Sequence, residues 1–316
     1  MSTLSLIIPV FNEAPVLEAC LARCASALAA ESLQWNVLFV DDGSSDASWQ
    51  IITRLSASDS RVSGLRLARN FGKEAALTAG LDAVEADVAV VLDADLQDPP
   101  ELIPAFLAKW REGFDVVYGL RSSRLGESWL KRTTARGFYA LISRFSDTPI
   151  PRDTGDFRLL SRRALAQLKL LRERNRFMKG LFAWIGLPHT AVPYQRQPRA
   201  AGSSKWNYWR LWNFALDGIT SFTTLPLRLA TYIGALTALF AFCFGFFILF
   251  RTLIYGTDLP GYPSMMVTMM FLGGMQLIAL GIIGEYLGRV VYEVKQRPIY
   301  LVQEVLLPRA AARQEG

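Results

Sequence analysis

The sequence predicts an α/β fold, a doubly wound and mostly parallel sheet, followed by a helical membrane part. Two observations lead to this prediction. Through the first half of the chain, short apolar runs rich in β-branched residues alternate with helical segments, which is typical of βαβ units with right-handed crossovers. Beyond residue 225, two long stretches carry no charged residue at all.

Each predicted strand is a short apolar run, and each predicted helix follows it with apolar residues at helical spacing. The expected strands are Leu4–Val10, Asn36–Val40, Val62–Leu67, Asp87–Leu92 and Asp115–Tyr118, and the expected helices are Ala14–Ala30, Ser45–Ala57, Lys73–Val84 and Pro99–Arg111. After Gly119 the pattern becomes irregular, with a basic loop, a helix near Ser128–Phe145, the segment Asp153–Arg158 and one further helix.

The two uncharged stretches are long enough to cross a bilayer. Residues 229–250 lie between Arg228 and Arg251, and Leu259–Gly284 forms the second stretch. At about 1.5 Å per residue the first measures about 33 Å, against about 30 Å for a hydrocarbon core. A buried helical hairpin in a soluble protein is the alternative, although such helices are seldom this long without a charge. Between Trp206 and Phe222, aromatic and charged residues mix as in interfacial helices, or as in an ordinary core helix.

Topology follows from the chain ends and the basic residues. Met1–Val10 lacks the basic start of a signal peptide, so we expect a cytoplasmic first domain, with two spans returning the tail to the same side. Basic residues after the second span agree with this, whereas Arg251 lies at the far side and is expected to snorkel. Three cysteines, two of them one helical turn apart, argue against a disulfide framework.

The net charge of +6 is concentrated near the membrane part. We expect the basic residues there to meet anionic lipid headgroups rather than nucleic acid, since no nucleic-acid-binding module is recognised. They form two groups: Arg158, Arg162, Arg163, Lys169, Arg172, Arg174, Arg176 and Lys179, and then Arg196, Arg199, Lys205 and Arg210.

Polar residues stand at the ends of three predicted strands. The first, second and fourth strands end in Pro9–Glu13, Asp41–Asp46 and Asp93–Gln97. In an open parallel sheet the carboxyl ends of the strands form the ligand-binding crevice, so these turns should share one site. On extended backbone Asp93, Asp95 and Gln97 would point the same way and converge on a hard cation that binds a diphosphate. Asp is also common in ordinary turns, which is the alternative interpretation.

Several chemistries are disfavoured. A single histidine, His189, hardly allows a histidine-based zinc site or a Ser-His-Asp triad, and we interpret it as structural. Neither GxxxxGK[ST] nor GxGxxG occurs. Oxygen ligands alone suit Mg²⁺ or Mn²⁺.

Five motifs in order, followed by two spans, resemble family 2 glycosyltransferases of the polyprenyl-phosphate type, such as dolichol-phosphate mannosyltransferases and bacterial undecaprenyl-phosphate glucosyltransferases. The motifs are Pro9–Glu13, Asp41–Asp46, Arg69–Lys73, Asp93–Pro100 and Gly202–Lys205. The resemblance covers nearly the whole chain. It implies a GT-A nucleotide-sugar domain at 1–202, an interfacial amphipathic helix at 203–225, a transmembrane hairpin at 226–288 and a cytoplasmic tail at 289–316.

The resemblance also implies roles for individual residues. Nucleotide and donor binding fall to Pro9, Phe11 (where the family commonly has tyrosine), Glu13, Val40, Asp42, Lys73, Asp93 and Ala94. Asp95 and Gln97 would hold Mg²⁺ or Mn²⁺, Arg121 would contact the donor phosphates, and Arg124 would be a further substrate-binding residue. Arg199 and Lys205 would meet the lipid phosphate, and Asp156 would lie on the acceptor side. Asp95, Arg121, Asp156 and Lys205 are the residues expected to carry the reaction.

The implied reaction is inverting transfer of a sugar, with UDP-glucose favoured, to a polyprenyl phosphate such as undecaprenyl phosphate, at the cytoplasmic face of a bacterial inner membrane. The product would serve envelope glycan or lipid modification. Two alternatives stay open at this point. A processive polysaccharide synthase would carry a Gln-x-x-Arg-Trp motif and more spans, and a scaffold would only bind nucleotide-sugar. Homo-oligomers are compatible with the glycine-rich patches of the second stretch.

Overall fold

The computed structural model describes residues 2–121, 154–174, 176–195, 225–256 and 261–307. The expected helix near Ser128–Phe145 and the expected interfacial segment Trp206–Phe222 lie outside these residues. So do Arg124, Arg199 and Lys205.

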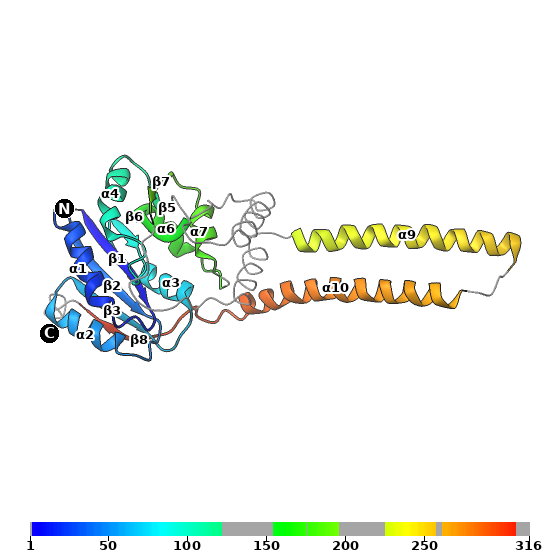
Figure 1. Ribbon diagram of the computed structural model, residues 1–316, viewed down its shortest axis with the longest axis horizontal. Coiled ribbons are helices and arrows are strands. Elements are labelled where there is room, and N and C mark those ends of the chain that lie inside the picture. The colour runs from blue at the N-terminus through cyan, green and yellow to red at the C-terminus, as the bar shows by residue number, and fades with distance from the viewer. Residues whose placement is uncertain (1, 122–153, 175, 196–224, 257–260, 308–316) are drawn as a thin grey trace.

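The first domain is built on one eight-stranded sheet in the order β7-β5-β6-β4-β1-β2-β3-β8 (Figure 1). β4, β1, β2 and β3 are mutually parallel, as are β5 and β7. β6 runs antiparallel between β4 and β5, and β8 runs antiparallel to β3 at the other edge. The strands are β1 (Thr3–Val10), β2 (Gln34–Asp41), β3 (Val62–Leu67), β4 (Val88–Val91), β5 (Val116–Arg121), β6 (Thr154–Ser161), β7 (His189–Tyr194) and β8 (Val302–Leu306).

Helices cover both faces of the sheet, which confirms the doubly wound fold. Alternate residues of β1 separate the two cores: Leu4, Leu6 and Ile8 pack on one side, and Ile7 packs on the other. Helices α1, α2 and α4 lie on the first face, and α3, α6 and α7 on the second. Their bounds are α1 (Leu17–Leu28), α2 (Ser48–Ser58), α3 (Lys73–Ala83), the short 3₁₀ helix η1 (Pro100–Leu102), α4 (Ile103–Arg111), α6 (Arg162–Leu170) and α7 (Met178–Trp184).

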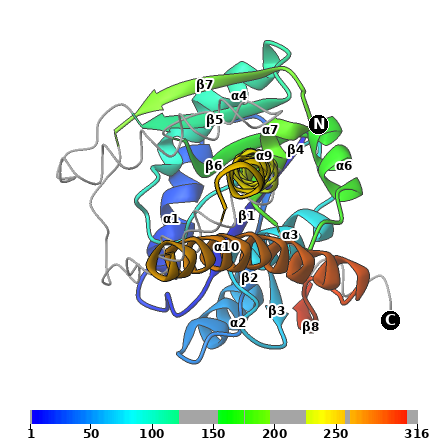
Figure 2. The same ribbon diagram turned by 90° about the vertical axis from the view of Figure 1, so that its right-hand side faces the viewer.

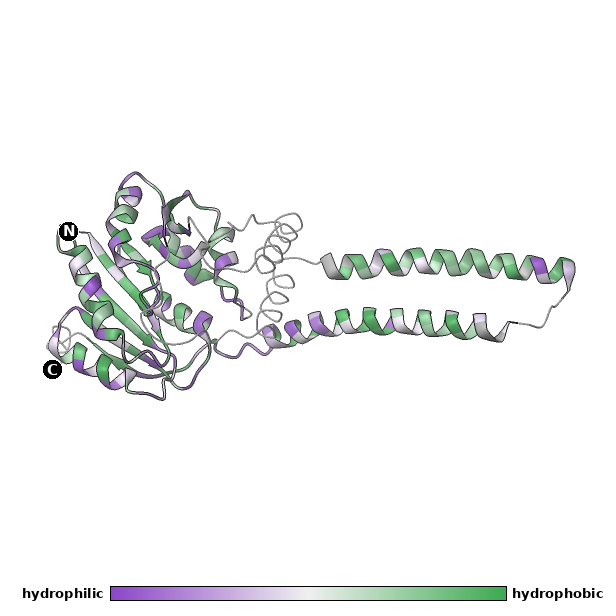
Figure 3. Ribbon diagram, viewed as in Figure 1, coloured by the Kyte–Doolittle hydropathy of each residue, from purple (hydrophilic) through white to green (hydrophobic). Residues whose placement is uncertain are grey.

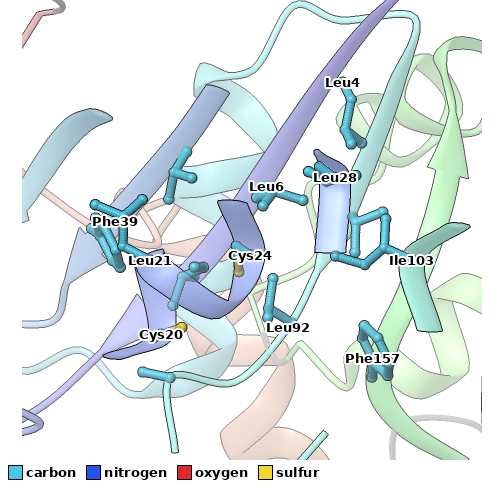
Figure 4. Packing of buried hydrophobic residues seen from close by; sticks show 14 of the residues in the cluster. Leu4, Leu6, Cys20, Leu21, Cys24, Leu28, Phe39, Leu92, Ile103 and Phe157 are labelled. Atoms are coloured by element: carbon cyan, nitrogen blue, oxygen red, sulfur yellow. The ribbon is translucent and has the colours of Figure 1, made fainter. Parts of the chain in front are cut away.

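The core of the first face is formed mainly by α1 against β1 and β2 (Figure 4). Cys20 and Cys24 lie one helical turn apart on the buried side of α1, and neither forms a disulfide. Burial and the neighbouring Cys24 raise the pKa of Cys20 well above its usual value. Both thiols are therefore packing groups of the core.

Two long apolar helices follow the sheet domain, α9 (Leu225–Tyr255) and α10 (Tyr262–Val294) (Figures 1 and 3). Within them, Leu229–Tyr255 and Ser264–Val294 are long and apolar enough to cross a membrane, and neither is buried in the protein. The two helices run side by side, with the Thr237 hydroxyl 3.1 Å from Met275 Sδ. A fully exposed apolar surface of this size is stable in a lipid environment rather than in water.

Strand β6 differs from the sequence prediction, which left Asp153–Arg158 irregular. Asp156 and Arg158 interrupt its apolar pattern, yet Arg158 is buried within the domain. Because the charged groups find partners inside the fold, the strand is stable although its sequence lacks the usual alternation. Strand β7 was missed because Pro193 lies in it, which is tolerated in a strand at the edge of a sheet.

Strand β8 comes from the segment that follows α10, after the chain has run through both apolar helices (Figure 2). It pairs with β3 from Gly64↔Leu306 to Leu67↔Val302, and Trp49 Nε1 donates a 3.0 Å hydrogen bond to Glu304. The expected tail at 289–316 therefore contributes a strand to the sheet of the first domain. The end of α10 is consequently attached to that domain through β8.

Candidate active site

The β1–α1 and β2–α2 loops are tied together at the carboxyl ends of their strands. Asn12, in the left-handed conformation with φ of 55°, accepts hydrogen bonds through Oδ1 from Ser45 N and Asp46 N at 2.8 and 3.3 Å. The amides of Asn12 and Glu13 donate to Ser44 Oγ and Ser48 Oγ, both at 3.0 Å. These contacts bring the predicted Pro9, Phe11 and Glu13 next to the 41–46 turn.

Asp42 links the second loop to the start of α3. Its Oδ1 accepts from Phe71 N at 2.7 Å and its Oδ2 from Gly72 N at 2.9 Å. Burial raises the pKa of Asp42 even though these two amides favour the charged form. Gly43, with φ of 67°, allows the close approach, because a Cβ there would lie 2.6 Å from the Arg69 carbonyl carbon. Asp42 thus positions the Arg69–Lys73 segment, a role that the sequence analysis did not assign.

The Asp93–Gln97 segment is a turn, and the expectation of extended backbone is wrong. β4 ends at Val91, and Leu96 has φ of 60°. Asp95 Oδ1 accepts from Gln97 N at 3.1 Å, an Asx-type contact that folds the segment back on itself. Asp95 is 7% exposed and the preceding Ala94 is buried, so the turn still holds Asp95 at the sheet edge.

Lys73, the first residue of α3, joins two carboxylates, Asp93 in the turn after β4 and Asp156 on β6. Its Nζ lies 2.7 Å from Asp93 Oδ1 and 2.6 Å from Asp156 Oδ2. Burial alone would lower the pKa of Lys73, but the two carboxylates raise it above its usual range. Burial conversely favours the neutral form of Asp156, and Lys73 and Lys179 overcome this and hold its pKa below its usual value. Lys73, Asp93 and Asp156 thus form a triad in which Lys73 and Asp156 are both charged at neutral pH.

Further buried charges surround the triad. Burial and the Asp156 carboxylate raise the pKa of Glu74 to about 7, and its Oε2 accepts from Met178 N at 3.2 Å. Burial lowers the pKa of Lys179 and lowers that of Arg158 to about 10. Arg158 Nη2 donates to Gly155 O at 2.8 Å, and its guanidinium lies 3.8 Å from the centre of the Phe182 ring.

Arg121 lies at the end of β5 beside this cluster. Its Nε donates to Tyr194 Oη at 3.3 Å, its Nη2 lies 3.9 Å from Asp98 Oδ1, and Tyr194 donates a hydrogen bond to Asp98. Its guanidinium covers Gly155, where a Cβ would lie 2.7 Å from Nη2. Arg121 is thus fixed near Asp156, as a phosphate-binding cation should be.

Several cations of the basic group at residues 158–179 pair with carboxylates within the structure, and the prediction that this group meets lipid headgroups stays a prediction. The pairs are Arg162 with Asp87, Arg163 with Asp115, Arg172 with Asp82, and Arg174 with Glu293. Arg158 is buried, and burial lowers the pKa of Lys179, whereas the Asp156 carboxylate favours its charged form. Sequence spacing alone does not distinguish cations paired within the fold from cations on a membrane surface.

Sequence reasoning missed Glu74, Asp98, Lys179 and Tyr194 as parts of the site. Glu74 directly follows Lys73 at the start of a helix, and Asp98 follows the acidic turn. Their positions in the sequence could therefore have indicated that they belong to the site. Lys179 and Tyr194 lie about 80 to 100 residues further along the chain. Tyr194 reaches the site on β7, and Lys179 reaches it on α7, which lies in the chain between β6 and β7, the strands that were not predicted.

The oxygen groups of the Asp93–Gln97 turn are suited to a hard divalent cation. Asp95 uses one oxygen for the Gln97 amide and, as a carboxylate, offers further lone pairs. Among the described residues, no group of three or more His, Cys, Asp or Glu side chains forms a closed metal cage.

Residues 5–169 match the family described as glycosyl transferase family 2. The chain belongs to this family. An uncharacterized glycosyltransferase of Synechocystis sp. is 49% identical over 302 residues, covering 96% of this chain and 95% of its own. A prophage-derived bactoprenol glucosyl transferase of Shigella flexneri is 46% identical over 301 residues, covering 95% of this chain and 97% of its own.

Among solved structures, glucosyl-3-phosphoglycerate synthase from Mycobacterium tuberculosis, in complex with Mn²⁺, UDP and its product, is 20% identical. The match covers 69% of this chain and 78% of that one, with a TM-score of 0.48. The family assignment makes this chain a glycosyltransferase, so the charged cluster at the carboxyl edge of the sheet is interpreted as its active site.

Proposed function

We propose that this family 2 glycosyltransferase transfers glucose from UDP-glucose to a membrane polyprenyl phosphate such as undecaprenyl phosphate. One observation carries the proposal. The cation-rich acidic cluster around Lys73 lies in a sheet that also contains β8, the strand that follows two membrane-length helices. This arrangement suits both a water-soluble sugar donor and a lipid acceptor. The name of the Shigella relative, bactoprenol glucosyl transferase, supports the same sugar and acceptor class.

The nucleotide would lie on the loops after β1 and β2. Phe11 is exposed at this edge and offers a ring for packing, and Pro9, Glu13, Val40 and Asp42 surround it in the proposal. Asp93, Ala94 and Lys73 would line the sugar and diphosphate. Lys73 is placed for this because its ammonium already links Asp93 to Asp156.

Asp95 and Gln97 would hold Mg²⁺ or Mn²⁺. When bound, such a cation neutralises charge that develops on a leaving diphosphate. Arg121, fixed by Tyr194 and Asp98, is oriented to contact the same phosphates. Arg124, Arg199 and Lys205 lie outside the described residues and are proposed as further phosphate contacts, the last two for the lipid.

A lipid phosphate is already anionic, so attack on the anomeric carbon requires positioning more than a general base. The C1–O bond to UDP breaks as the phosphate oxygen forms the new bond, and UDP leaves with the electron pair. In-line attack inverts the anomeric carbon, so α-linked donor gives β-linked polyprenyl-phosphate glucose. Asp156 would orient a sugar hydroxyl or the lipid phosphate.

The proposed location is the cytoplasmic face of a bacterial inner membrane. UDP-glucose is a cytoplasmic metabolite, and the pairing of β8 with β3 supports a position of the end of α10 on the side of the donor site. Basic residues after the second span agree with a cytoplasmic tail. The lipid-linked sugar would then be available for envelope modification.

The test is transfer of radiolabelled glucose from UDP-glucose to undecaprenyl phosphate by the full chain in lipid nanodiscs, with Mg²⁺, Mn²⁺ or EDTA. We expect a single-sugar lipid product that depends on the cation. Asp95→Asn should abolish transfer, whereas Asp59→Asn, which alters an exposed pair with Arg61, should not. A polymer would indicate a processive synthase. Binding of UDP-glucose without turnover would indicate a scaffold, and wild-type turnover by Asp95→Asn would refute the assigned metal site.

A further inference from the structure

The end of α10 is attached to the catalytic domain by side-chain contacts as well as by β8. Glu293, in the last turn of α10, accepts a 2.7 Å hydrogen bond through Oε1 from Arg174 N, and its Oε2 lies 3.9 Å from Arg174 Nη1. Arg174 Nε donates to Arg297 O at 2.7 Å. Further on, Tyr300 donates to Asp82, on α3, at 3.0 Å. The apolar helix thus ends against elements of the active site rather than in a free linker.

Arg174 belongs to the segment that leads into α7 and the charged cluster. Arg176 Nη1 donates to Leu171 O at 2.8 Å, and Met178 N donates to Glu74 Oε2 at 3.2 Å. Lys179 follows Met178, and its ammonium lowers the pKa of Asp156. Separate hydrogen bonds thus hold Arg174 to Glu293 on α10, and Met178, the residue before Lys179, to Glu74, the neighbour of Lys73.

We propose that Glu293 is a positioning residue for the transfer reaction. Through Arg174 it fixes the segment that leads into α7, and so positions Met178, whose amide contacts Glu74, and the next residue, Lys179. The carboxylate contacts no part of the triad itself, so its effect is transmitted through the backbone of this segment. The inference deepens the proposed function and rests on it, because its assay is sugar transfer to the lipid.

The geometry favours positioning over simple stabilisation of the fold. Glu293 is 44% exposed and its contact with the Arg174 guanidinium is long, so the ion pair adds little stability. Its short contact is instead to a backbone amide of the segment that precedes Lys179. Loss of this contact frees a loop that ends in an active-site cation, and a misplacement of about 1 Å can cost roughly a hundredfold in rate.

The test compares Glu293→Ala with Glu293→Gln in the full chain in nanodiscs. Gln keeps an oxygen for Arg174 N, so we expect near-normal kcat, whereas Ala should lower kcat about tenfold or more. KM for UDP-glucose, the affinity for UDP and the thermal midpoint should change little. Glu285→Ala is the matched control, because it removes an i,i+4 pair with Arg289 from the same helix, two turns earlier.

A double-mutant cycle with Lys179→Met separates positioning from a general effect. If Glu293 acts through Lys179, Glu293→Ala should add no further loss in the Lys179→Met background. Arg174→Met, which keeps the backbone amide, should give a smaller loss and provides a second variant if Glu293→Ala folds poorly. Additive losses, or a normal kcat for both Glu293→Ala and Arg174→Met, would overturn the inference. Absence of lipid product from the wild-type chain would instead overturn the proposed function.

Discussion

Replacing Lys73 with Met tests whether the triad holds the site together. The substitution keeps the length and apolar stem of the side chain but removes the ammonium that lies 2.7 and 2.6 Å from Asp93 and Asp156. Asp156 has a side chain 13% exposed, so it would remain as a nearly buried carboxylate without its main partner. Breaking a fully buried pair costs about 3–5 kcal/mol. Because Lys73 itself is 43% exposed, solvent screening reduces the expected loss to roughly 2 kcal/mol.

The pH dependence of this loss has a definite sign. The pKa of Asp156 is lowered in the folded state, so its stabilisation is present above the unfolded value of about 3.9 and is lost as pH falls further. The pKa of Lys73 is raised, so its contribution is lost only at alkaline pH, above about 10.4. The difference in unfolding free energy between wild type and Lys73→Met should therefore be constant near neutral pH. It should narrow below about pH 5, where Asp156 of the variant becomes protonated first.

The assay is urea unfolding of the full chain in detergent. Unfolding is monitored by tryptophan fluorescence, to which Trp35 and Trp49 in the sheet domain contribute. Lys109→Met is the matched control. It makes the same change to a lysine 40% exposed and paired with Glu112, and should cost about 0.5 kcal/mol or less. Glucose transfer should fall at least tenfold for Lys73→Met, since about 1.4 kcal/mol of lost transition-state stabilisation is enough for that. Equal unfolding free energies for the two variants would refute the reasoning.

Three further predictions follow from the site and the topology. Gly155→Ala should lower transfer while leaving the thermal midpoint nearly unchanged, because a Cβ at this position would lie 2.7 Å from Arg121 Nη2 and displace the flexible end of that side chain. A loss of activity that adds to the loss caused by Arg121→Ala would contradict this explanation. Glu74→Gln should remove an inflection near pH 7 from the activity profile. The variant should also unfold at a higher urea concentration than wild type above pH 7, because the pKa of Glu74 is raised in the fold and its ionisation therefore destabilises the fold as pH rises. An unchanged pH profile of activity would contradict the effect of Glu74 ionisation on activity. In a cysteine-free background, an impermeant thiol reagent should label Tyr255→Cys but not Leu307→Cys in intact cells, and the reverse pattern would place the catalytic domain outside.

The sequence was sufficient for the parts of the fold that depend on local patterns. Val62–Leu67 was predicted with its observed bounds, and the other strands and helices predicted between residues 4 and 118 occur within a few residues of their expected positions. Apolar periodicity specifies these elements because each buries a whole face against its neighbours. The expected parallel arrangement also predicted correctly that the carboxyl ends of β1, β2 and β4 lie at one edge of the sheet.

Elements that depend on distant partners were not predictable in this way. β8 is stable because it pairs with β3 and because Trp49 contacts Glu304, 255 residues further along the chain. β6 tolerates charged residues because Lys73 neutralises Asp156 and Phe182 covers Arg158. The turn at Asp95 depends on one side-chain contact and on the left-handed conformation of Leu96, and strand alternation gives no sign of either.

The position of β8 is consistent with the proposed reaction, in which one site would bind a soluble donor and a lipid acceptor. Leu301 O accepts from Ala68 N at 2.9 Å, directly after the end of β3, so the segment from α10 meets the sheet at the carboxyl edge of the parallel strands. That edge also carries Asn12, Asp42 and the Asp93–Gln97 turn. The chain from Lys295 to Leu301 has seven residues and spans at most about 25 Å. Under the proposed function, α10 reaches membrane length and Glu293 lies in its last turn, so the proposed donor loops would open toward the membrane rather than away from it. A sheet attached to the hairpin by its opposite edge would hold the same catalytic residues far from any lipid phosphate.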